Sequence, residues 1–171
     1  METIKELYKI GHGPSSSHTI GPERICKRVM EMYDGDSYEV TLYGSLSFTG
    51  KGHLTDEIIK RTLGNVEVIF SKELKLEHPN TMDIKIYKEG SLIGEERFYS
   101  IGGGSILRKG DSLKAGRQIY PHQSFKEIKE YCLENHLTLY DYVYRFEDDD
   151  FKNHLVEVWK VMQQAINFGL H

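Results

Sequence analysis

The stretch Gly13-Pro14-Ser15-Ser16-Ser17-His18-Thr19 stands directly before residues 20–33, where apolar residues recur mostly at helical spacing. The Gly-Pro pair breaks the chain, so the hydroxyl groups are predicted to cluster at a helix N-terminus. Unpaired backbone N–H groups and the helix dipole favour anions at such a position. An ordinary N-cap with spare polar neighbours would explain the same residues without a ligand.

A second histidine lies on a glycine-rich loop, in the stretch Gly50-Lys51-Gly52-His53 that follows a predicted strand. Two imidazoles on tight loops, one beside an anion-favouring helix start, indicate a site for a small carboxylate with proton transfer nearby. Simple turn formation also accounts for the glycines around Lys51. Because both loops lie at the ends of elements, we expect His18 and His53 to face one shared site.

The pattern along the chain predicts an α+β domain: a mostly antiparallel sheet with inserted helices and a helical C-terminal tail. Alternation predicts strands over 37–45 and 65–70, a hairpin over 82–99 and a strand over 105–108, with a helix over 54–63. In the tail, Ser124 and Thr138 are predicted to cap helices, and 151–168 forms a third. Its apolar face is expected to dock on the domain's own sheet or to contact a partner.

Composition excludes several classes of function. A chain of 171 residues fits one domain, and its net charge of −4, without a dominant basic segment, argues against a nucleic-acid surface. Cys26 and Cys132 are far apart and are predicted to be core residues rather than metal ligands. No apolar run approaches the roughly 18 residues of a membrane span, and no signal peptide is recognised, so a cytoplasmic protein is expected.

Three motifs carry a resemblance to a known family. The first stretch, continued by Gly21-Pro22, resembles the N-terminal signature of the iron–sulfur L-serine dehydratases. The other two are similar to its second and third signatures: Gly44-Ser45-Leu46 leading to 49–53 with Asp56, and Ser100-Ile101-Gly102-Gly103-Gly104. The resemblance runs from about Tyr8 to Gly169 and concerns only the β chain, or β domain. Residues 1–171 are thus interpreted as a single β domain without the catalytic α part, as either a natural subunit or a truncated piece.

The resemblance implies a lyase of serine degradation and gluconeogenesis that converts L-serine to pyruvate and ammonia. It implies a [4Fe-4S] cluster bound by the α part and not by this chain, an α chain or domain as partner, and it allows a homodimer. It carries over His18 and His53 as catalytic residues, without settling which is the base. It also carries over four substrate-binding residues: Ser16, Ser17, Thr19 and Lys51. No residue of this chain is predicted to bind metal, and no membrane partner is expected.

Two alternatives stay open at this stage. A similar domain in some phosphoglycerate dehydrogenases is a regulatory module, so this chain could bind a small anion or serine without catalysis of its own. It could also be an interaction protein without activity. The two histidines favour catalysis, because an anion sensor would more naturally use Lys or Arg. His12 is predicted to lie at the surface, and Asp56 to cap its helix.

Overall fold

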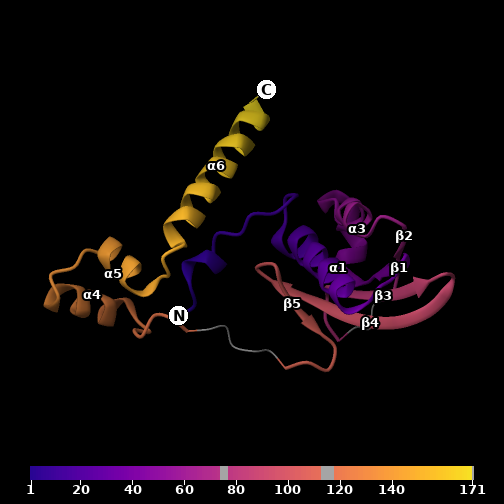
Figure 1. The fold of residues 1–171 in the computed structure, drawn as a ribbon, viewed down its shortest axis with the longest axis horizontal. Coiled ribbons are helices and arrows are strands. Elements are labelled where there is room, and N and C mark those ends of the chain that lie inside the picture. The colour runs from indigo at the N-terminus through magenta and orange to yellow at the C-terminus, as the bar shows by residue number, and fades with distance from the viewer. Residues whose placement is uncertain (74–76, 113–117, 171) are drawn as a thin grey trace. The chain divides into compact units, whose positions relative to one another are not determined.

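The computed structural model describes residues 1–73, 77–112 and 118–170. The chain divides into two compact units, and each is described by itself. The sheet unit is Gly11–Leu113, and the helical unit combines Met1–Ile10 with the chain from Lys114 onward. Figure 1 labels their elements.

The sheet has five strands in the order β2-β1-β3-β4-β5. Only the β1–β2 pair is parallel, so the predicted mostly antiparallel sheet is confirmed. Every strand lies where the alternation placed one, with small differences at the ends. The bounds are β1 Ser37–Leu42, β2 Val66–Phe70, β3 Thr81–Lys88, β4 Ser91–Gly102 and β5 Ser105–Arg108.

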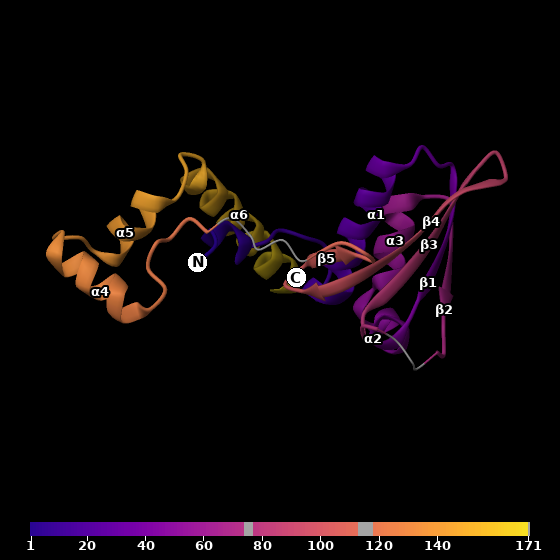
Figure 2. The ribbon, with the colours of Figure 1, turned by 90° about the horizontal axis from the view of Figure 1, so that it is seen from below.

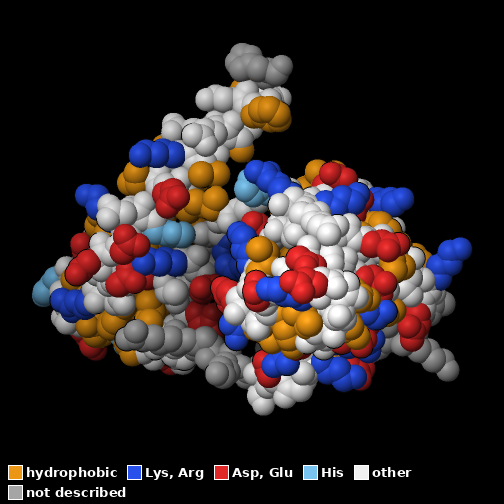
Figure 3. All heavy atoms as spheres, turned by 45° about the vertical axis from the view of Figure 1, so that its right-hand side comes forward, with side chains coloured by type: hydrophobic (Ala, Val, Ile, Leu, Met, Phe, Trp, Pro, Cys, Tyr) orange, Lys and Arg blue, Asp and Glu red, His pale blue; other side chains and the backbone are white. Residues whose placement is uncertain are grey.

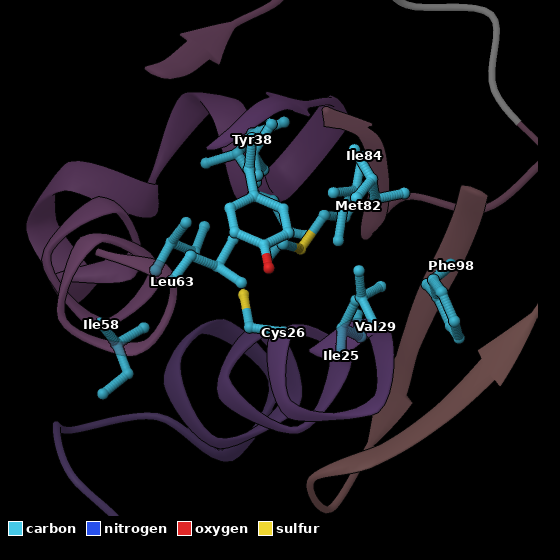
Figure 4. Close-up of a cluster of buried hydrophobic side chains, with 14 residues drawn as sticks. Ile25, Cys26, Val29, Tyr38, Ile58, Leu63, Met82, Ile84 and Phe98 are labelled. Carbon is cyan, nitrogen blue, oxygen red and sulfur yellow. The ribbon is translucent and has the colours of Figure 1, made fainter. Parts of the chain in front are cut away.

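Two helices, α1 (Gly21–Met32) and α3 (Thr55–Leu63), cover one face of the sheet (Figure 2). Their apolar stripes meet the inward residues of the strands in a single cluster, part of which is shown in Figure 4. In β1 the buried positions alternate with half-buried ones, as a two-layer structure requires. The fully buried members include Ile25, Val29, Val40, Leu42, Leu46, Ile59, Met82, Ile84 and Ile86.

Three short helical segments connect these elements. They are η2 (Ser16–Ile20, a π-helical turn), which precedes α1, and α2 (Gly44–Phe48) and η3 (Gly50–His53), which lie between β1 and α3. The strand expected to reach Ser45 ends at Leu42, because Gly44 adopts a φ of 52° that extended chain does not allow. The hydroxyl-rich stretch forms the helical turn that leads into α1, rather than a loop before it.

The helical unit contains η1 (Ile4–Glu6), α4 (Phe125–Glu134), α5 (Leu139–Phe146) and α6 (Phe151–Leu170). Both predicted caps are confirmed as capping boxes, Ser124 with Glu127 and Thr138 with Asp141.

The longest helix, α6, anchors in the helical unit through Phe151, which is buried. Most of its other apolar side chains are exposed, and some of them are visible in orange along α6 in Figure 3. No helix in the described part of the chain is long and apolar enough to cross a membrane. Contact of this exposed apolar face with a partner stays a prediction.

Candidate active site

The structure brings the two predicted histidines together. His18 comes from η2 and His53 from η3, and their ring centroids lie 4.7 Å apart with the ring planes tilted by 32°. The two imidazoles therefore lie side by side, as expected, and their roles at a common site stay a prediction.

His18 is the enclosed member of the pair, with 8% of its surface exposed. Its Nδ1 lies 2.9 Å from Ser17 Oγ and its Nε2 lies 3.0 Å from Ser45 Oγ, so both ring nitrogens have hydroxyl partners. Burial, followed by the charge of His53, lowers the pKa of His18 below its usual value of 6.5. His18 is thus held neutral at neutral pH.

His53 is half-buried, and its geometry defines which nitrogen carries the proton. Its Nδ1 lies 3.0 Å from the carbonyl oxygen of Thr49. A carbonyl can only accept, so Nδ1 donates, and the neutral ring keeps Nε2 as a free lone pair. Among the described residues no hydrogen bond engages Nε2. His53 is therefore the imidazole prepared to accept a proton.

Three hydroxyl groups hold the η2 turn in place, one from its own N-cap and one each from β4 and α3. Ser15 caps it, its Oγ accepting a hydrogen bond from the backbone N–H of His18 at 3.2 Å. Ser100 Oγ donates to the carbonyl of Ser17 at 2.8 Å, and Thr55 Oγ1 donates to the carbonyl of His18 at 2.7 Å. The backbone on both sides of the imidazole is thereby fixed from β4 and α3.

The third motif, residues 100–104, also supports the η2 turn. Ser100 is fully buried, and a Cβ added at Gly21 would lie 2.9 Å from Ser100 Cβ and closer still to its Oγ. The start of α1 can approach β4 only because residue 21 is glycine. Beyond Ser100, the run 102–104 has positive φ at all three glycines, which explains its composition.

The four predicted substrate-binding residues have different surroundings. Ser16 is exposed in the first turn of η2, and Ser17 lies beside His18. Lys51 is exposed, with its Nζ 5.2 Å from the centroid of the Phe70 ring. The hydroxyl of Thr19 donates to the carbonyl of Ser15 and accepts from its N–H, so it is already engaged in the turn.

Other sequence predictions are settled by the contacts. Asp56 does not cap α3: no side chain caps that helix, and Asp56 pairs with Lys60 instead at 3.3 Å. The expectation failed because Leu54, at a φ of 59°, occupies the N-cap position. His12 is exposed, as predicted.

Sequence reasoning missed residues that hold the imidazoles. Ser45 and Thr49 contact His18 and His53, while Thr55 and Ser100 bond to the backbone of the first motif. Three of them lie inside the quoted second and third motifs, so their place there was the available signal. Three of the contacts join residues at least 27 positions apart in the sequence, which concealed them, whereas Thr49 and His53 are only four positions apart.

The cysteines do not form a cluster site. Such a cluster requires several thiolates gathered at one point. Cys26 is buried in the sheet unit, where burial raises the pKa of its thiol, and Cys132 is buried in the helical unit. In the described ranges, no group of three or more His, Cys, Asp or Glu side chains is arranged to hold a metal ion. The donor set of these described residues therefore does not fit an iron–sulfur cluster.

Comparison with known proteins identifies the family of this chain. Residues 3–68 and 60–111 match the family described as "Serine dehydratase beta chain". L-serine dehydratase 2 of Escherichia coli is 29% identical, over 99% of this chain and 49% of that protein. L-serine dehydratase of Haemophilus influenzae is 30% identical over 100% and 50%, and that of Helicobacter pylori 28% over 98% and 48%. The chain belongs to the serine dehydratase β-chain family, and it spans about half the length of these relatives.

Proposed function

We propose that this chain is the β part of an L-serine ammonia-lyase, which converts L-serine to pyruvate and ammonia, and that it contributes proton-transfer and substrate-binding groups. The observation that carries the proposal is the pair of imidazoles 4.7 Å apart, one enclosed and one with a free ring nitrogen. Family membership supports the reaction class, since the relatives matched are named L-serine dehydratases.

In this proposal His53 Nε2 accepts the α-proton of L-serine. Loss of that proton and of the hydroxyl group, as water, leaves aminoacrylate. Its imine tautomer takes up water and releases ammonia and pyruvate, so the net reaction neither consumes nor produces water. The Nδ1–H bond to the Thr49 carbonyl fixes the ring and stabilises the imidazolium that forms.

His18 assists without changing charge. Because its pKa is lowered by burial and by His53, it stays neutral when His53 becomes protonated. Its hydroxyl partners Ser17 and Ser45 fix the ring plane next to His53. We assign it an orienting role and assign the base to His53, a choice that the sequence left open.

The substrate carboxylate is proposed to bind at the first turn of η2. Ser16 and Ser17 lie there with backbone N–H groups that have no intrahelical partner, and the helix dipole adds to the attraction. Lys51 supplies a positive charge from η3, which also carries His53. The prediction for Thr19 stays a prediction, and its engaged hydroxyl favours a role in shaping the turn.

A regulatory anion site is the second candidate. A cavity of about 260 Å³ lies beside the site loops, lined by His12, Gly13, Thr19, Leu54, Glu57, Ile58 and Arg61. The guanidinium of Arg61 suits a carboxylate, which favours binding of a small anion without catalysis. The cluster held by the α part, the α partner, the homodimer and the cytoplasmic location stay predictions that accompany the main proposal.

The test is assembly of this chain with the α part of a serine dehydratase under anaerobic conditions, followed by measurement of pyruvate formed from L-serine. The proposal expects turnover that requires both parts. Serine binding by this chain that is abolished by Arg61→Ala, together with no pyruvate in the assembled protein, would favour the regulatory candidate instead.

A further inference from the structure

Both imidazoles are held from one short element. His18 Nε2 contacts the hydroxyl of Ser45 in the first turn of α2, and His53 Nδ1 donates to the carbonyl of Thr49, the residue that ends α2. We propose that Ser45 and Thr49 are positioning residues, and that α2 orients the two histidines together. Their importance for catalysis rests on the proposed function, whereas the positioning itself can be measured without turnover.

Ser45 is itself fixed from the sheet side. Its backbone N–H donates to the carbonyl of Pro79 at 2.7 Å, just before β3 begins. Gly44, with its φ of 52°, turns the chain after β1 and is the first residue of α2, so that Ser45 lies in the first turn of this helix. The hydroxyl group of Ser45 therefore reaches His18 from a backbone with little freedom.

Thr49 is tied to Ser45 across one helical turn. Its backbone N–H and its Oγ1 both donate to the Ser45 carbonyl, at 3.0 Å and 2.8 Å. The carbonyl of Thr49 then accepts the Nδ1–H of His53. A continuous path of hydrogen bonds and one helical turn thus joins the two rings, in addition to their direct contact.

The hydroxyl partner of His18 and the carbonyl partner of His53 differ in their hydrogen-bonding chemistry. The Thr49 carbonyl can only accept, so it selects one tautomer of His53. The Ser45 hydroxyl can donate or accept, so it holds His18 in place in either tautomer. Removing it leaves Nε2 of an enclosed ring without that partner, which is costly and loosens the ring.

The chain offers a matched control in the same helix. Ser47 also uses its hydroxyl once, donating to the carbonyl of Ser71 at 2.7 Å, and it does not touch either imidazole. Ser45→Ala and Ser47→Ala therefore each remove one hydroxyl from α2 and one hydrogen bond. Only the first variant alters the environment of His18.

The experiment records ¹⁵N signals of the histidine rings in the full chain by NMR, for the wild type and three variants. The wild type should show His53 protonated on Nδ1. Ser45→Ala should shift the ring signals of His18, and Ser47→Ala should leave both rings unchanged. Thr49→Val removes the side-chain bond from Oγ1 to the Ser45 carbonyl and keeps the one from the backbone N–H; it should reduce the Nδ1–H tautomer of His53 while leaving His18 in place. A temperature scan confirms that each variant is folded.

Unchanged ring signals in folded Ser45→Ala, or equal shifts in folded Ser47→Ala, would overturn the proposal. If Ser45→Ala does not fold, Thr49→Val decides alone, and an unchanged His53 tautomer overturns it. In the assembled enzyme, Ser45→Ala should lower kcat roughly 10- to 100-fold with little change in KM, the scale expected for a misplaced catalytic group. Ring shifts without any dehydratase activity in the wild type would refute the proposed function and leave the positioning intact.

Discussion

Replacing Gly21 by alanine tests how closely the start of α1 must approach β4. The backbone at Gly21, with φ and ψ both −58°, suits alanine, which would gain about 0.5–1 kcal/mol from helix propensity. Against this, the new Cβ would lie 2.9 Å from Ser100 Cβ and closer to Oγ. Overpacking costs about 1–3 kcal/mol, and loss of the bond from Ser100 to Ser17 about 1 kcal/mol. We therefore expect a net loss of about 1–3 kcal/mol.

Native-state hydrogen exchange measures this loss in the sheet unit, using core amides such as those of Val40 and Ile84. The double variant with Ser100→Gly is the control, because it removes the colliding atoms. Its destabilisation should be smaller than the sum of the two single effects by about 1 kcal/mol or more. Additive effects, or a stabilised Gly21→Ala, would refute the steric argument.

Three further predictions concern pH and packing. The lowered pKa of His18 favours its neutral form in the folded state, so the unfolded chain binds more protons below about pH 6.5. The free energy of unfolding should therefore decrease as the pH is lowered below this value. Urea titrations should show a smaller decrease for His18→Asn. Leu46→Ala, at a fully buried position of α2, should cost about 2–5 kcal/mol in the same titration, whereas Phe48→Ala, at an exposed one, should cost less than about 0.5 kcal/mol. On α6, Phe151→Ala should cost about 3–5 kcal/mol in the helical unit, and Phe168→Ala almost nothing, as Trp159 fluorescence during unfolding would report.

The sheet could be predicted because its strands alternate clearly. Tyr38, Val40 and Leu42 are buried at every second position, as their spacing indicated. The capping boxes at Ser124 and Thr138 are equally local signals, and both are confirmed. The two imidazoles were predicted to meet because each was expected on a loop at the end of an element, and the structure places them in the short helical segments η2 and η3.

The supporting contacts of the site could not be predicted in this way. The hydroxyl of Ser45 reaches His18 only because a left-handed glycine ends β1 and starts α2, and alternation alone extended that strand through Ser45. The bond from Ser100 to Ser17 joins residues that are distant in sequence, so only the folded sheet shows it. The tautomer of His53 likewise depends on a carbonyl that η3 brings within reach.

The most direct test of the proposed base is the turnover of His53→Asn in this chain assembled with the α part of a serine dehydratase. If His53 Nε2 removes the α-proton of L-serine, pyruvate formation should fall roughly 10²-fold or more while the variant stays folded. His136→Asn is the control, since that histidine is exposed in the helical unit and its φ of 54° suits asparagine. A loss of tenfold or less for His53→Asn, beside an unchanged His136→Asn, would contradict the assignment of the base.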